Sequence, residues 1–386
     1  MKKLTLVIFI FLILTVAGKG YSFHYDFSIE DIPMMIMGTD VTNASFYSFY
    51  NIANLTLKLY FSDQTMLKFR LKDTYFDLQK TNNFYIDRLS LYYREEGFGL
   101  IAGRDFFIEN DGIIIANLAD GLKLDLNLLQ MKERIYVYYS GLLPMEINQF
   151  EMGIYDLQLT NGPQRLFMGL ALEKTGLLTE SMSLLLLYSM DVSTNKYYNP
   201  FYAGLNIRES INAPLSVEAN LVCEAGNVDN SNSILAFGGD AGIVYLSKGE
   251  LTWGGLLKFA IATGEGEGNN TEQFRSFGLY NTGFVLNPYF SNLFMIQAGL
   301  ILKALEESLS VNLNYYYMSR MSTNDTVYGF YDGKGNSIGN EISGSVVYNL
   351  DANFSLFLHA GYFMIGDAFT STANRYKVFS GISIKL

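Results

Sequence analysis

Cysteine, histidine, tryptophan and proline are all scarce in this chain of 386 residues, which contains one Cys, two His, one Trp and six Pro. The single Cys223 cannot form an internal disulfide, and it lies on the same side of an alternating pattern as Val217, Ala219 and Leu221. We therefore interpret it as a small apolar residue rather than a nucleophile. The scarcity of proline fits a chain built of hydrogen-bonded strands, because proline cannot donate to a β-ladder.

Long apolar runs are also missing after the first residues of the chain. The nearest candidate for a membrane helix, Leu293–Leu302, meets Lys303 after about ten residues, roughly half of the ~20 that a spanning helix needs. Yet 49% of the residues are hydrophobic and 15% are aromatic. Apolar content that is spread through short alternating segments is typical of a transmembrane β-barrel.

The chain begins with Lys2 and Lys3, an apolar run over Leu4–Ala17, and small residues at positions 18, 20 and 22. This pattern predicts a cleaved signal peptide over residues 1–22, because the run is too short to cross a bilayer. The whole chain has a net charge of −11, and removal of this segment with its lysines leaves the rest more acidic still. Such a charge argues against nucleic acid as a partner, since phosphate binding needs a concentrated basic surface.

The last strands carry the clearest alternation in the sequence. In the final one, Tyr376, Val378, Ile382, Ile384 and Leu386 share one face, whereas Lys377, Ser383 and Lys385 share the other. A long strand with an apolar face is prone to aggregate at a sheet edge, unless the sheet closes and the apolar face meets lipid. The sequence therefore predicts an all-β fold for residues 23–386, a transmembrane antiparallel up-and-down β-barrel.

Period-2 alternation predicts about eighteen strands, an even number as in bacterial outer-membrane barrels. They are Phe23–Glu30, Tyr50–Phe61, Thr65–Leu78, Phe84–Arg94, Phe98–Ile108, Leu118–Asn127, Glu133–Gly141, Arg165–Lys174, Ser181–Asp191, Phe201–Arg208, Pro214–Gly226, Ile234–Leu246, Glu250–Thr263, Ser291–Lys303, Ser308–Arg320, Asn340–Leu350, Phe354–Gly366 and Arg375–Leu386. Tight turns alternate with long polar loops, which predicts both barrel termini in the periplasm. The alternating segment Phe150–Leu159 is assigned to a long outer loop, where it could fold into the lumen as a hairpin.

Ionisable side chains at membrane depth should point into the lumen. The strands up to Arg165 then send inward the basic residues Lys58, Lys68, Arg70, Lys72, Arg88, Arg94, Arg104, Lys123, Arg134 and Arg165, against the single acid Asp125. Later strands send inward Glu173, Glu218, Glu224, Asp240 and Glu341 together with Arg208, Lys258, Lys303, Arg320 and Lys377. We take Lys68, Arg70, Lys72, Arg88, Arg104, Lys123, Arg134 and Arg165 as pore-lining, with Arg70, Lys72, Arg88, Arg104 and Arg134 at the constriction.

Two interpretations of this basic wall stay open. It could lower the barrier for anionic solutes, as rings of Arg and Lys do in anion pores. Alternatively, its cations could pair with acids from folded-in loops and brace a wide barrel.

The segment LIAGRDFFIENDGIIIANLADGLKLDL, from Leu100 to Leu126, resembles the alginate-export family of outer-membrane porins. In that family a strand ending in Gly-Arg is followed by a loop and by an Asp-Gly that opens the next strand, and Gly103-Arg104 and Asp120-Gly121 stand in these places. The stretch from Ile338 to Phe369 is similar to the closing hairpin of the family, and Gly283–Leu293 is similar to its late outer loop. The resemblance implies a monomeric barrel of about eighteen strands with an arginine-lined passage for an acidic polysaccharide, with Arg104 as the residue carried over.

Residues for chemistry are few. A hydrolase built around His359 would need Ser or Asp within hydrogen-bond reach, so a histidine exposed to the lumen is the preferred interpretation. The loop GEGEGNN lacks the Lys-Ser/Thr of a phosphate loop. Its Glu265 and Glu267, with Asp325 and Asp332, could hold calcium, although a solvated acidic loop is favoured. We expect no enzyme activity, no metal site and no cofactor.

The predicted function is passive passage of small or oligomeric anionic solutes, including acidic oligosaccharides, through the outer membrane of a Gram-negative-type bacterium. Outer-membrane lipid and the barrel-assembly machinery are the other expected partners. The alternatives are a general porin with little selectivity and a plugged structural or adhesive surface barrel.

Overall fold

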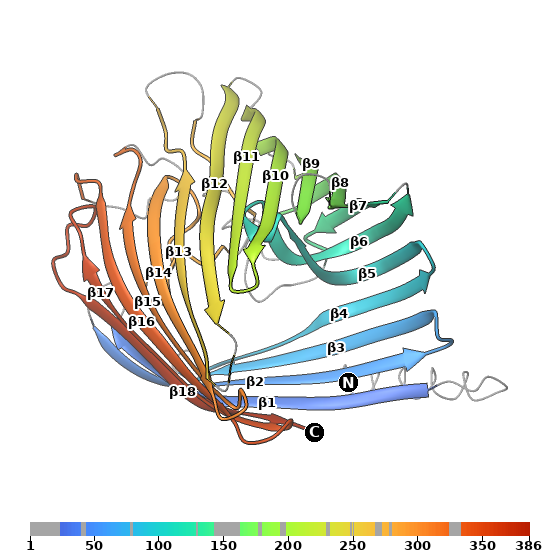
Figure 1. Ribbon diagram of the computed structural model, residues 1–386, viewed down its shortest axis with the longest axis horizontal. Helices are drawn as coiled ribbons and strands as arrows, with labels where there is room; N and C mark the ends of the chain where they lie inside the picture. Colours follow the sequence, from blue (N-terminus) through green and yellow to red (C-terminus); the bar gives the residue numbers. More distant parts are fainter. Residues whose placement is uncertain are drawn as a thin grey trace.

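The computed structural model describes residues 24–386 apart from 40–43, 78–79, 129, 143–162, 177–179, 194–197, 229–231, 248, 250, 267–271, 278–279 and 324–332. Within these residues the chain forms a single antiparallel sheet of 18 strands that closes on itself, because β1 pairs with both β2 and β18 (Figure 1). The predicted signal peptide lies outside the described residues. No helix in the described part is both long and apolar enough to cross a membrane.

The strands follow one another around the barrel in chain order. They are β1 (His24–Thr39), β2 (Ser45–Tyr60), β3 (Thr65–Phe76), β4 (Thr81–Glu95), β5 (Phe98–Glu109), β6 (Ile115–Leu128), β7 (Met131–Ser140), β8 (Arg165–Thr175), β9 (Ser181–Asp191), β10 (Tyr198–Asn212), β11 (Leu215–Val228), β12 (Asn232–Ser247), β13 (Thr252–Ala262), β14 (Leu293–Ala304), β15 (Leu309–Ser319), β16 (Ser337–Asn349), β17 (Phe354–Ile365) and β18 (Arg375–Lys385). A short 3₁₀ helix, η1 (Asn110–Gly112), lies between β5 and β6. The predicted barrel and its strand number are confirmed.

The ends of the first two strands differ from the prediction. β1 continues to Thr39 instead of ending at Glu30, and β2 begins at Ser45 instead of Tyr50. The predicted first strand stopped three residues before Pro33. In the structure Pro33 stays paired with β2, whereas the ladder between β1 and β18 passes from Asp31 to Met34 without it. The missing N–H of proline is thus accommodated on one side of a strand that continues past it.

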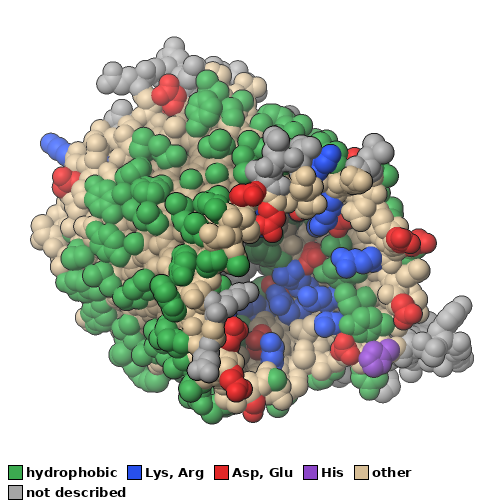
Figure 2. All heavy atoms as spheres, in the orientation of Figure 1, with side chains coloured by type: hydrophobic (Ala, Val, Ile, Leu, Met, Phe, Trp, Pro, Cys, Tyr) green, Lys and Arg blue, Asp and Glu red, His purple; other side chains and the backbone are tan. Residues whose placement is uncertain are grey.

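The outside of the barrel is apolar. Alternate residues such as Leu221, Leu300 and Leu313 are exposed there, and Figure 2 shows apolar side chains covering the outside of β12–β17. Exposed aromatic side chains lie toward both ends of the strands, for example Phe27 near one end of β1 and Phe49 near the opposite end of β2. An apolar band with aromatic residues at both of its borders is the surface that a bilayer requires.

The two rims differ in their connections. One rim, here called the short-turn rim, carries turns such as Phe61–Gln64 and Leu350–Asn353, together with the first and last described residues. The other, the long-loop rim, carries the segments between β7 and β8, β13 and β14, and β15 and β16. The lengths of the connections therefore distinguish the two rims of the barrel.

Two chain segments occupy part of the lumen toward the long-loop rim. The end of the β5–β6 hairpin leaves the wall, since β4 pairs with β5 only up to Leu89 and Arg104 and β6 pairs with β7 only from Asp120. Buried side chains of this hairpin, among them Ile113 and Ile114, join those of the β13–β14 connection, among them Phe274 and Phe277, in one apolar cluster. The interior therefore contains a packed apolar region in addition to its polar lining residues.

Candidate functional site: a charged lumen with two inserted segments

Five cations on neighbouring strands point into the lumen and form what we call the basic row. They are Lys58 on β2, Lys68, Arg70 and Lys72 on β3, and Arg88 on β4. Their place follows from register, because Lys58 and Lys68 lie opposite each other and opposite Asp26, between the outward-facing Tyr25 and Phe27. Figure 2 shows Lys and Arg side chains gathered in the hollow of the barrel.

Lys58 and Lys68 carry the uncompensated charge of this row. They are direct cross-strand partners, and among the described residues neither has an acid within ion-pair distance. Like charges placed opposite each other destabilise a sheet. Lys72 lies over the ring of Tyr85, with 5.7 Å from its Nζ to the ring centroid. The row therefore keeps a positive field on this side of the lumen.

The arginines of the basic row are paired with acids that the prediction had not placed in the lumen. Arg70 donates to Asp87, and Arg88 donates to Asp105, which also accepts a hydrogen bond of 2.7 Å from Tyr92. Asp87 reaches the lumen because a bulge in β4 leaves it without a partner between the pairs Arg70–Arg88 and Leu71–Ile86. The prediction of a single inward acid in this part of the chain was wrong.

Arg104 is the main correction to the predicted pore lining. It lies in register with Leu89, which is 41% exposed on the outer surface, and with Asp120. Its Nε and Nη2 donate to the two carboxylate oxygens of Asp120 at 2.9 and 2.8 Å, and the side chain is 2% exposed. The pair is thus held in the wall on its outer side. The outward-facing Phe106 and Ile108 on the same strand indicate this face, because they share the parity of Arg104.

The same observation affects the resemblance to the alginate-export family. Gly103-Arg104 and Asp120-Gly121 are partners in the middle of the paired strands β5 and β6 rather than the end of one strand and the start of the next. The residue carried over from that family therefore contributes no charge to the lumen.

The remaining predicted pore residues face the lumen but have partners there. Lys123 lies 3.7 Å from Asp125, and Arg134 lies 3.1 Å from Glu109. Arg165 is completely buried, where it donates to the carbonyl of Tyr198 at 2.8 Å and stacks over Phe277. It supports the inserted protein and does not line open space.

The tip of the β5–β6 hairpin is fastened to the opposite wall. Asp111 accepts hydrogen bonds from Arg208 and Asn206 of β10, the latter at 2.8 Å, and from Asn220 of β11 at 3.3 Å. Gly204 makes room for the tip, because a Cβ there would lie 3.1 Å from Asn110. This inserted segment therefore reaches inside the barrel from β5–β6 to β10 and β11, and it narrows the lumen.

Three inward acids fasten the second inserted segment, the β13–β14 connection. Glu224 accepts the backbone N–H of Arg275 at 2.9 Å, and Asp240 accepts the phenol of Tyr280 at 2.6 Å. Burial and the nearby Asp240 carboxylate raise the pKa of Tyr280, so this phenol stays protonated and remains a donor. Glu341 accepts three backbone N–H groups, from Phe284, Val285 and Leu286. The far wall uses its acids to hold protein in the lumen.

We expect Glu341→Ala to loosen this segment and to raise single-channel conductance and open-channel noise, because three N–H groups lose a buried charged acceptor. Ser345→Ala is the matched control, since Ser345 lies on the same strand but bonds Asn312 of β15. Equal conductance of the two variants in a planar bilayer would contradict the anchoring role.

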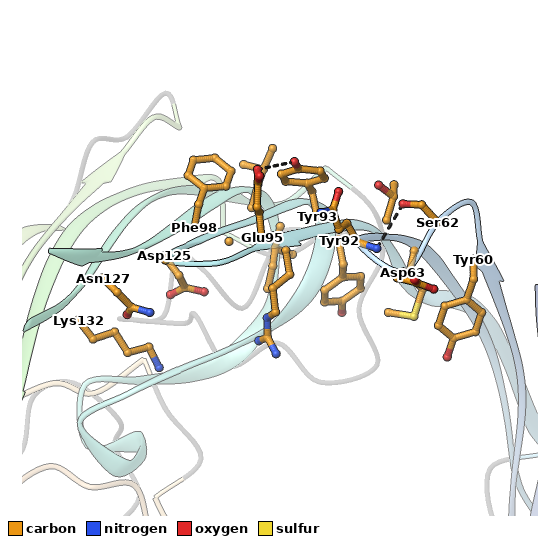
Figure 3. A pocket seen from close by; sticks show the side chains of 18 residues that line it. Tyr60, Ser62, Asp63, Tyr92, Tyr93, Glu95, Phe98, Asp125, Asn127 and Lys132 are labelled. Atoms are coloured by element: carbon orange, nitrogen blue, oxygen red, sulfur yellow. Dashed lines mark hydrogen bonds between the residues drawn. The ribbon is translucent and has the colours of Figure 1, made fainter. Parts of the chain in front are cut away.

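The short-turn mouth of the lumen contains a recess of about 680 Å³. Figure 3 shows Tyr60, Tyr92, Asp125, Asn127 and Lys132 pointing to one side of the wall, while Tyr93 and Phe98 point to the other. This alternation places the polar groups toward the passage. Charges of both signs are present at this mouth, among them Asp125 and Lys132.

Two sequence hypotheses about chemistry can be placed. His359 lies on the lumenal face against aromatic rings, 4.8 Å from that of Phe379 and 6.1 Å from that of Phe284 between ring centroids, an environment that resembles packing rather than catalysis. Of the proposed calcium ligands, Glu267, Asp325 and Asp332 lie outside the described residues, as does the predicted hairpin Phe150–Leu159.

Comparison with known proteins identifies the fold alone. Neither the protein-family models nor the curated sequences contain a match. Similar solved structures include Pseudomonas aeruginosa OccK11 (OpdR), with TM-score 0.62, 13% identity and coverage of 94% of this chain and 96% of that one. P. aeruginosa OccK2 (OpdF) in complex with glucuronate has a TM-score of 0.63 and 12% identity, with 94% of this chain and 98% of that one covered. P. aeruginosa OpdK with vanillate has a TM-score of 0.58 and 10% identity, with the same coverages of 94% and 98%. The chain therefore has the 18-stranded barrel fold of porin-type outer-membrane proteins.

Proposed function

We propose that this protein is an outer-membrane channel through which small anionic solutes diffuse. The observation that carries the proposal is the pair Lys58 and Lys68, which face each other in the lumen without an acidic partner among the described residues. Two adjacent cations in a narrowed, partly protein-filled passage attract anions and repel cations. In this proposal the chain reaches the outer membrane after loss of residues 1–22, with the help of the barrel-assembly machinery.

The chemistry of the solute follows from the same residues. Lysine ammonium groups and the guanidinium groups of Arg70 and Arg88 suit carboxylates, and the neighbouring acids Asp87 and Asp105 leave only part of that capacity free. Two structural neighbours were solved with carboxylates, glucuronate and vanillate, which supports a small carboxylate as the preferred solute. Passage of an acidic polysaccharide, which the alginate-export resemblance implies, stays a prediction.

A plugged structural or adhesive barrel is the second candidate, and the two inserted segments with their apolar cluster favour it. A general porin with little selectivity is the third. The three differ in conductance, because a plugged barrel carries no current and a general porin passes both ions nearly equally.

Planar-bilayer recording of the purified protein under a potassium chloride gradient tests the proposal. We expect discrete channels with a reversal potential displaced toward that of chloride. In liposome swelling, glucuronate should enter faster than its size alone allows, with uncharged glucose as the matched solute. A folded protein without current, or a reversal potential near zero, would contradict the proposal in favour of the second or third candidate respectively.

A further inference from the structure

Three polar side chains stand on the outer face of β1–β3, within a largely apolar surface. Unlike the outer pair Arg104 and Asp120, they form no ion pair with one another. Asp31 lies four residues from the exposed Phe27 and four from the exposed Met35 on the same face of β1. Its row continues through Ala53 of β2 to Asp73 of β3. Carboxylates at this depth are costly against lipid tails, which offer no hydrogen-bond donors.

Each of these residues has an oxygen without a partner. The Oδ1 atoms of Asp31, Asn51 and Asp73 are shielded from solvent and accept no hydrogen bond. Asn51 belongs to the same patch, because it lies on the outward face of β2 one pleat from Ala53 and in register with Tyr75. On β11, β12 and β14 the outward face instead holds apolar residues such as Leu221, Ile243 and Leu300, and the outer charges Arg104 and Asp120 satisfy each other. We define Asp31, Asn51, Ala53 and Asp73 as the polar patch.

Asn51 and Asp73 lie at nearly the same depth in the membrane. A register row is the line of directly paired residues that runs across neighbouring strands. The row through Tyr60 meets β4 at Tyr92, three residues before the short-turn end of that strand, and β10 at Tyr202, ten residues before its short-turn end. Each row therefore rises toward the long-loop rim as the strand number increases. The path from Asn51 to Asp73 has two steps: ~4.8 Å across to Tyr75 on β3, which leads toward the long-loop rim, and ~6.6 Å back along β3 to Asp73, which leads toward the short-turn rim. With strands tilted by ~45° the two steps leave a difference of roughly 1 Å.

We propose that the polar patch is the contact between two copies of this chain in the membrane, related by a two-fold axis along the membrane normal. Such an axis exchanges left and right at constant depth, so it brings the Asn51 amide of each copy opposite the Asp73 carboxylate of the other. One donor and one acceptor are thus paired twice, which is the self-complementarity that an isologous contact requires. Ala53, between them, lets the two walls approach closely at the axis.

Asp31 fits the same arrangement. It lies two steps along the register row from Asp73, ~7 Å closer to the short-turn rim. At this position it lies near the two-fold axis, opposite Asp31 of the second copy. No other part of the outer surface described in the structure combines unsatisfied acceptors with an amide donor. The proposed partner is a second copy of the same chain.

Cysteine cross-linking in purified protein in lipid nanodiscs tests the contact, in a Cys223→Ala background that removes the only native thiol. Ala53→Cys should give a disulfide-linked species of twice the chain mass after oxidation. Leu300→Cys, at an apolar position that is 61% exposed on β14, is the matched control and should remain monomeric. A monomeric Ala53→Cys protein that shows the heat-modifiable mobility of a folded barrel would overturn the proposal.

A residue exchange tests the chemistry. Asn51→Asp alone places two carboxylates opposite each other and should halve the mass measured in nanodiscs, whereas Asn51→Asp combined with Asp73→Asn restores the donor–acceptor pair and the dimer. Asn51→Leu with Asp73→Leu should also give monomers. An unchanged mass in all three variants would mean that the polar patch faces lipid. Because the experiment measures mass alone, its outcome does not depend on the proposed channel function.

Discussion

Replacement of Lys58 and Lys68 by glutamate should turn an anion-preferring channel into a cation-preferring one. A unit charge acts on an ion ~6 Å away with roughly 0.7 kcal/mol in water-like surroundings. Reversing two lysines changes the lumenal charge by four units, and screening by salt reduces the combined effect to a change of roughly tenfold in the permeability ratio of chloride to potassium. The reversal potential under a salt gradient measures this directly.

The control for this experiment is Lys174→Glu, compared with Lys58→Glu. Lys174 lies near the end of β8 on the outward face, in register with Met131 and Met182, so the substitution changes the net charge equally without touching the lumen. Similar shifts of the reversal potential from both substitutions would show that the selectivity comes from the overall charge and not from the basic row.

The pair of Arg104 and Asp120 should behave in the opposite way, with a large effect on stability and a small one on transport. Asp120→Leu leaves a buried guanidinium without its carboxylate partner and should lower the free energy of unfolding by about 3–5 kcal/mol. The double variant Arg104→Leu, Asp120→Leu should recover most of this loss, because a hydrophobic pair suits the outer side of the wall. Denaturant unfolding in detergent or lipid measures both.

Transport provides the complementary measurement for this pair. The double variant should keep the conductance and reversal potential of the unmodified protein. A lost anion preference in Arg104→Gln, with the fold intact, would contradict the assignment of Arg104 to the outer face and return it to the lumen.

The barrel itself could be predicted because its signal is local and repeated. Alternation around residues such as Phe354–Ile365 fixes strand, face and partner together, since a slip by one residue exchanges the two faces. The ends of strands were harder to predict. The predicted first strand stopped at Glu30, whereas β1 continues through Pro33, which pairs with β2 and not with β18.

The lumen was predicted less well for two physical reasons. The prediction assumed that every arginine points inward, which reversed the face of Arg104 although Phe106 and Ile108 held the correct parity. It also assumed unbroken alternation in β4, whereas a bulge brings Asp87 and Arg88 to the same side. No pattern in the sequence marks the contacts of Asp111 or Glu341, because each joins residues from distant parts of the chain.

The seam between β1 and β18 has a consequence for biogenesis. Seven residue pairs, from Glu30–Lys385 to Gly38–Lys377, join β1 to β18, so the ring can be sealed only after β18 has been synthesised. A product that stops before Arg375 leaves β1 and β17 with unpaired edges, which can pair with other chains and aggregate. Closure of the barrel therefore has to wait for the strand that joins both ends of the sheet.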